Sequence, residues 1–80
     1  MNIQLIHGQF SAQEAIDIIT RMVHVKIRFQ EDKINAHTSE EDIKMREMRI
    51  KQLQKELFEV RKFVDSKTDG VKINSTINIE

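Results

Sequence analysis

The feature that most constrains this chain is a heptad repeat of mainly apolar residues in its second half. The spacing between successive members alternates between three and four residues. This is the a and d pattern of a helix that packs lengthwise against another helix. We therefore predict a helix over 39–66, and the rest of the chain must cover its seam or close its ends. The repeat consists of Ile43, Arg46, Ile50, Leu53, Leu57, Val60 and Val64.

A capping box predicts the start of an earlier helix over 12–36. The Ser11 hydroxyl can accept a hydrogen bond from the Glu14 backbone N–H, and the Glu14 carboxylate can accept one from the Ser11 N–H. Residues 38–41 repeat this pattern, with Thr38 as the cap of the second helix. Apolar side chains cover roughly 200° of the first helix, whereas a surface helix typically shows an apolar stripe of about 100°. The first helix therefore needs more than one neighbour to cover it.

The two predicted helices form an antiparallel hairpin, because only the short connection 37–39 separates them. Counting outward from this connection places Ile27 opposite Ile50 and Ile19 opposite Leu57. Apolar positions match along the whole length of the hairpin, which supports the pairing. The predicted seam consists of Ile16, Ile19, Val23, Ile27, Ile43, Ile50, Leu53, Leu57, Val60 and Val64.

Both ends of the chain have the alternation of apolar and polar residues that is typical of a strand. The range 71–79 alternates with one interruption, Ser75, on its apolar face. The range 2–6 alternates less regularly because Ile6 breaks the pattern, and we expect a turn at Gly8 after it. Since one strand enters and the other leaves the same end of the hairpin, they would run antiparallel if they pair.

These elements predict a single α+β domain over 1–80 with the order β-α-α-β. A chain of 80 residues buries a modest share of its surface and usually gains stability from disulfides, a metal or a partner subunit. The absence of cysteine excludes disulfides. We therefore expect a homo-oligomer, most simply a two-fold dimer with a four-helix core. The alternative is a monomer in which both strands fold back over the first helix.

Charge and composition exclude several functional classes. Thirteen Lys and Arg balance thirteen Asp and Glu, so the chain as a whole lacks the basic excess that is typical of a binder of nucleic acid or membrane. No basic segment followed by an apolar run resembles a signal peptide, and no apolar run has the length of a membrane span. We expect a cytoplasmic protein without membrane contact.

One candidate site is a polar layer in the helix seam near the connection, formed by Lys26, Gln30 and Arg46. Buried charge is costly unless it is paired. The layer could fix the register of the helices and the oligomeric state, as polar residues at a positions do in coiled coils. Alternatively, it could bind a small anion.

A second candidate is a line of lysines, defined as Lys44, Lys51, Lys55 and Lys62, on one side of the second helix. These residues fall within about 40° of one another on the helical wheel and extend over about 27 Å. Such a line could follow a phosphate backbone, and it is also the solvated outer face usual for a coiled coil.

The first helix has two pairs of opposite charge at the i,i+4 spacing of surface ion pairs, Asp17 with Arg21 and Arg28 with Asp32. Motifs for metal or nucleophilic catalysis do not occur, so we expect no enzyme, cofactor or metal site. The first-choice function is a small non-enzymatic assembly or adaptor protein that acts through protein–protein contacts and self-association. A nucleic-acid-binding regulator that uses the line of lysines is the alternative, and binding of a small anion at the polar layer is a weaker one.

Overall fold

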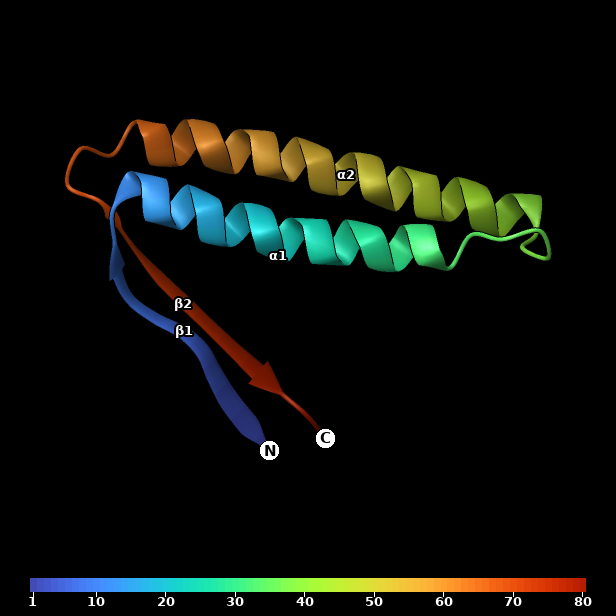
Figure 1. The fold of residues 1–80 in the computed structure, drawn as a ribbon, viewed down its shortest axis with the longest axis horizontal. Helices are drawn as coiled ribbons and strands as arrows, with labels where there is room; N and C mark the ends of the chain where they lie inside the picture. The colour runs from blue at the N-terminus through green and yellow to red at the C-terminus, as the bar shows by residue number, and fades with distance from the viewer.

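A computed structural model describes all residues from 1 to 80 and has the element order β1-α1-α2-β2. This confirms the predicted α+β fold, a helical hairpin with a strand at each end. The helices lie side by side, and both strands leave the same end of the hairpin and diverge from α1 (Figure 1). The molecule is a flat V with extents of 47 × 33 × 13 Å, so a single layer of structure forms each arm.

Helix α1 (Ala12–Asp32) begins with the predicted capping box. Ser11 Oγ accepts from the Glu14 N–H at 3.2 Å, and Glu14 Oε1 accepts from the Ser11 N–H at 2.9 Å. The helix ends at Asp32 rather than at residue 36, so the predicted C-terminal end was wrong.

Side-chain hydrogen bonds in the connection explain this early end. The Asn35 Oδ1 atom accepts from the His37 N–H at 2.8 Å, and Thr38 Oγ1 donates to the Lys33 carbonyl at 3.1 Å. Thr38 Oγ1 also accepts from the Asn35 N–H at 2.9 Å. Asn and Thr offer the backbone these local partners in place of helical ones. The connection is therefore longer than the predicted range 37–39.

Helix α2 (Glu40–Asp65) is capped by Ser39, whose Oγ accepts from the Asp42 N–H at 3.2 Å. The N-cap was predicted one residue too early, at Thr38. The Thr38 hydroxyl instead forms hydrogen bonds with Asn35 and Lys33 in the connection. Three acidic residues occupy the first turn, where negative charge interacts favourably with the helix dipole.

The helices are in the predicted antiparallel register near the connection, where Arg46 Nη1 donates to Gln30 Oε1 at 2.8 Å. The interior between the helices is small. Only four of 80 residues are buried: Leu53, Leu57 and Val64 on α2, and Ala15 on the side of α1 next to the strands. The other predicted seam residues are half-buried: Ile16, Ile19, Val23, Ile27, Ile43, Ile50 and Val60.

Strands β1 (Asn2–Phe10) and β2 (Val71–Asn78) pair with each other in an antiparallel ribbon. The predicted end of β1 at residue 6 and the turn at Gly8 were wrong, because the strand continues to Phe10. The register shifts between Gln4 and Ile6, which leaves Leu5 as the extra residue of a β-bulge. The bulge reverses the alternation, so Ile3 and Ile6 lie on the same face.

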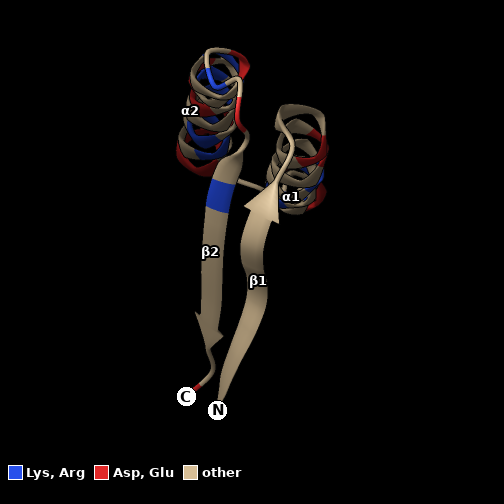
Figure 2. Cartoon of the chain, turned by 90° about the vertical axis from the view of Figure 1, so that its left-hand side faces the viewer, with Lys and Arg blue, Asp and Glu red and all other residues tan.

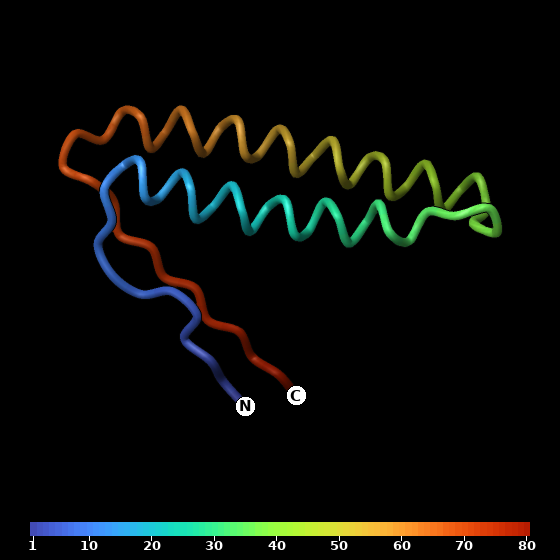
Figure 3. The backbone as a smooth tube through the Cα atoms, in the orientation of Figure 1, coloured from blue at the N-terminus to red at the C-terminus, as the bar shows by residue number.

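Glycine is required at the joint between the helices and the ribbon. Gly70 has a φ of +85°, and a Cβ at this position would overlap the Phe10 carbonyl oxygen. A side chain is therefore excluded both by the backbone conformation and by the close approach of the neighbouring strand. The backbone trace shows the ribbon closest to α1 at this joint and farthest from it at the termini (Figure 3).

Candidate functional site

Helix α1 carries a second apolar seam, distinct from the one that faces α2. At 100° per residue, this seam lies about 120° around the helix from the first. Its exposure rises away from the joint, since Ala15 is 0% exposed whereas Val25 is 69% and Phe29 is 56% exposed. The second seam consists of Ala15, Ile18, Met22, Val25 and Phe29, with the spacing of three and four residues that favours lengthwise packing.

The ribbon presents one apolar face and one polar face. Cross-strand partners such as Phe10 with Val71 and Ile3 with Ile77 put apolar residues opposite each other. Near the joint this face is half-buried, and towards the termini Ile3 is 40% and Ile77 is 41% exposed. The apolar face consists of Met1, Ile3, Ile6, Phe10, Val71, Ile73, Ile77 and Ile79.

The second seam and the apolar face of the ribbon together form the candidate interaction surface, which we call the V surface. Its two arms meet at the joint, where α1 contacts both strands and Ala15 is fully covered. Charge is almost absent from the ribbon, because Lys72 is the only Lys, Arg, Asp or Glu in the two strands. Figure 2 shows this contrast, with a nearly uncoloured ribbon below helices that carry both charge colours.

The polar layer in the helix seam is smaller than predicted. Arg46 and Gln30 meet across the seam in a partly buried hydrogen bond. Lys26, in contrast, is exposed, so Arg46 and Gln30 form the partly buried part of this layer. A lysine can lay its aliphatic stem along apolar surface while its ammonium group stays in water, which avoids the cost of burying the charge.

A shallow hollow of about 280 Å³ adjoins this layer and is lined by Gln30, Met45, Arg46 and Arg49. Arg49 was missed in the sequence, although it follows Arg46 by three residues and therefore lies on a neighbouring part of the helix surface. Neither arginine forms an ion pair with a carboxylate. The hollow can therefore offer two guanidinium groups and one amide to an anion.

The line of lysines on α2 is fully accessible. Lys44, Lys51, Lys55 and Lys62 are all exposed, and none forms an ion pair. The Lys62 ammonium group lies 4.8 Å from the centroid of the Phe58 ring, a cation–π distance. The charges of Lys44, Lys51 and Lys55 are free for either solvent or a polyanion, whereas that of Lys62 lies against the Phe58 ring.

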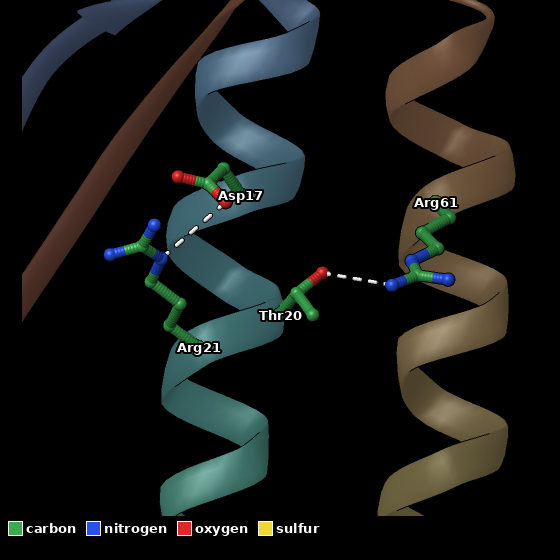
Figure 4. A network of polar contacts seen from close by, with 4 residues as sticks. All are labelled: Asp17, Thr20, Arg21 and Arg61. Atoms are coloured by element: carbon green, nitrogen blue, oxygen red, sulfur yellow. Dashed lines mark hydrogen bonds and ion pairs between the residues drawn. The ribbon is translucent and has the colours of Figure 1, made fainter.

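A polar side of α1 lies outside both seams, with Asp17 and Arg21 pointing away from α2 and Thr20 pointing towards Arg61 (Figure 4). Asp17 and Arg21 form the expected ion pair at 3.4 Å, and Arg61 Nη2 donates to Thr20 Oγ1 at 3.2 Å. The second expected pair, Arg28 with Asp32, does not form. In that pair the basic residue comes before the acidic one, which is the weaker order for an i,i+4 ion pair. Asp32 is also the last residue of α1, where the helix dipole disfavours a negative charge.

One carboxylate has a perturbed proton affinity. The hydrogen bond from the Ser11 backbone N–H, helped by the Ser11 hydroxyl, holds the pKa of Glu14 below its ordinary value. Both contacts belong to the capping box, so this shift reports on the start of α1. Glu14 is exposed and lines none of the hollows of the surface.

No group of three or more His, Asp and Glu side chains is arranged to hold a metal ion. Neither helix combines the length and the apolar character needed to cross a bilayer. No protein-family model matches the chain, and no curated protein or solved structure shows significant similarity to it.

Proposed function

We propose that this protein is a small, cytoplasmic, non-enzymatic assembly or adaptor protein that acts through protein–protein contacts and self-association. The observation that carries the proposal is its surface area. The folded chain exposes 6668 Å², whereas a compact monomer of 9.5 kDa exposes about 5,050 Å². One chain therefore leaves about 1,600 Å² more surface in water than a compact monomer of its mass.

The size of this excess is that of a permanent interface. If two copies each covered it, the association would bury about 3,200 Å² in total, within the range of about 2,000–5,000 Å² for obligate homodimers. Such interfaces are rich in apolar side chains, and large apolar residues are among the exposed ones, including Val25, Phe29 and Ile77. A partner surface of similar character is the simplest way to stabilise so open a fold.

Solution mass tests this proposal directly. We would measure light scattering over a wide dilution series and follow helix content by circular dichroism on the same samples. We expect the mass of a dimer, with helix lost only as the dimer dissociates. A stable monomer that keeps its full helix content at every concentration would contradict self-association.

Binding of nucleic acid is the alternative function, favoured by the exposed, unpaired line of lysines on α2. Replacing Lys44, Lys51, Lys55 and Lys62 by Gln should abolish binding to RNA or DNA and remove its salt dependence, while leaving the fold intact. A matched control removes the same amount of charge elsewhere, at Lys26, Lys33, Lys67 and Lys72. Equal loss of binding in both variants would assign the effect to net charge and contradict a dedicated line.

Binding of a small anion is a weaker alternative, favoured by the hollow beside Arg46. Phosphate or a small carboxylate should raise the Tm of the wild type but not that of Arg46→Met, since a ligand stabilises only a state that binds it. Arg61→Met is the control, because Arg61 lies on the polar side of the hairpin and outside the hollow. An equal rise in Tm in wild type and Arg46→Met would contradict this site.

A further inference from the structure

We propose that the V surface binds a second copy of this chain, so that the second seam of α1 in each copy packs against the apolar face of the ribbon in the other. This inference rests on the self-association proposed above and names the surface that makes it. The occupant is specified by the chain itself, because the two arms of the V have matching chemistry and comparable length.

The two arms are reciprocal surfaces. From Ile18 to Phe29 the second seam extends about 17 Å along α1, and from Ile3 to Phe10 the ribbon face extends about 23 Å. Around a two-fold axis, a seam-to-ribbon contact in one direction generates the same contact in the other. One interface then covers both arms of both copies.

A single chain cannot cover these arms by itself. The joint at Gly70 and Phe10 fixes the ribbon where it leaves the hairpin, and the arms diverge from there (Figure 1). The exposure of both arms rises with distance from the joint, to 69% at Val25 and 51% at Ile79. The uncovered parts of both arms therefore lie far from the joint. There the two arms of one chain are separated, and a second chain can contact both of them.

Charge supports a second copy as the occupant. The seam residues and the apolar face of the ribbon carry no charged side chain, so packing them together buries no side-chain charge of their own. The chain has thirteen basic and thirteen acidic residues, so two copies have no net repulsion to overcome.

The other exposed apolar side chains are a less suitable surface. On α2, the Phe58 and Phe63 rings are each 60% exposed, but Lys62 and Lys67 lie 4.8 Å and 4.7 Å from their centroids, so covering these rings would bring lysine charges into the interface. Within the V surface, Lys33 lies over Phe29 at the longer distance of 5.3 Å. Val25 is 69% exposed, more than Phe29 at 56%, which makes it the better probe.

A pair of charge substitutions tests the assignment. Val25 and Met48 are 69% and 70% exposed in the single chain, and both lie on helices. Val25→Glu and Met48→Glu should therefore disturb the fold of one chain to the same small extent. We expect Val25→Glu to raise the dimer Kd by about tenfold or more, because it buries a carboxylate in the interface, and Met48→Glu to leave the Kd unchanged.

Cross-linking provides a second readout that does not depend on destabilisation. The natural chain has no cysteine, so Val25→Cys and Ile77→Cys can be placed singly in chains with tags of different mass and then mixed. A bismaleimide should join the two differently tagged chains. A mixture of Lys55→Cys and Ile77→Cys chains is the control and should give little product, because Lys55 lies on the outer side of α2.

These measurements separate the inference from the proposed function. A wild type that is monomeric at every concentration would contradict both. A wild-type dimer that Met48→Glu weakens as much as Val25→Glu, or that gives no link between Val25→Cys and Ile77→Cys, would overturn the V surface as the interface and leave self-association in place. Selective weakening by Val25→Glu together with the link would support the inference.

Discussion

The two apolar seams of α1 have similar composition but different neighbours. Helix α2 covers the first seam, whose α1 residues Ile16, Ile19, Val23 and Ile27 are half-buried. Opposite them, Leu53, Leu57 and Val64 of α2 are at most 8% exposed. The ribbon covers the second seam only next to the joint, so Val25 and Phe29 remain more than half exposed. One helix thus contributes to two kinds of packing. The first seam stabilises the chain, and the second is available for association.

The difference shows that a heptad pattern specifies that a helix face needs a partner, but not which partner. Both seams have the three-and-four spacing that favours lengthwise packing. The short distance along the chain from α1 to α2 selects the partner of the first seam, whereas the direction of the joint keeps the ribbon away from most of the second. Substitutions in and between the seams can test this division.

The largest effect is expected in the covered seam. Leu57→Ala should lower the free energy of unfolding by about 2–4 kcal/mol, because it removes buried methyl groups and leaves a cavity between the helices. Urea denaturation at a fixed protein concentration measures this. Met48→Ala, at a site that is 70% exposed, should change the value by less than about 0.5 kcal/mol. Similar losses in the two variants would mean that the first seam is not a packed interior.

A somewhat smaller effect is expected at the joint, where the two arms of the V surface diverge. Gly70→Ala should cost about 1–3 kcal/mol, because alanine disfavours a positive φ and its Cβ would overlap the Phe10 carbonyl. Thermal melting measures the loss. Gly8→Ala is the control, since Gly8 also has a positive φ but has open space around it. Equal losses would show that the overlap contributes nothing and that the joint can open.

The start of α1, which both seams share, should show an effect of about 1 kcal/mol. Ser11→Ala removes an N-cap hydrogen bond and should lower stability by about that amount. Chemical denaturation at neutral pH would measure it. Ser39→Ala at the start of α2 should cost a similar amount, because Ser39 caps its helix in the same way. No loss in Ser11→Ala would contradict the capping box.

The capping box also predicts a dependence on pH. The pKa of Glu14 is lowered in the folded chain by the Ser11 backbone and hydroxyl hydrogen bonds. Its stabilising contribution is therefore complete above the ordinary glutamate range and is lost as the pH falls through the lowered value. The stability difference between wild type and Glu14→Gln should shrink over this acidic range. A difference that does not change with pH would contradict this linkage.

The smallest effect is expected on the polar side of α1, which belongs to neither seam. Asp17→Asn removes an exposed ion pair and should cost no more than about 0.5 kcal/mol, and less at high salt. Melting temperatures at low and high salt would measure this. A loss as large as that of Leu57→Ala would mean that the polar side is itself an interface.

Much of the helical part could be predicted from the sequence because its signals are local. The heptad spacing, the Ser11 box and the acidic first turn of α2 each lie within a few residues of the feature they specify. The end of α1 could not be predicted from periodicity, since it depends on hydrogen bonds between Asn35, Thr38 and Lys33 across the connection.

The ribbon and the candidate sites were less predictable because they depend on contacts between distant segments. Alternation in β1 is interrupted at Leu5, and only pairing with β2 reveals that the interruption is a bulge. Likewise, the hollow beside Arg46 forms only because the register of the two helices places Gln30 of α1 next to Arg46 of α2. The wide apolar arc of α1 did predict an additional neighbour, but the sequence alone could not show where the ribbon would leave that arc uncovered.

The bulge at Leu5 has a consequence for uncontrolled aggregation. A two-stranded ribbon has two free edges, and a regular, uncharged edge can recruit further strands into an open-ended fibril. The extra residue interrupts the row of backbone N–H and C=O groups along β1. Deleting Leu5 would preserve the apolar face, because the pairs on either side of it would join in one register. The resulting straighter edge should promote fibril growth, so the irregularity favours closed assembly over polymerisation.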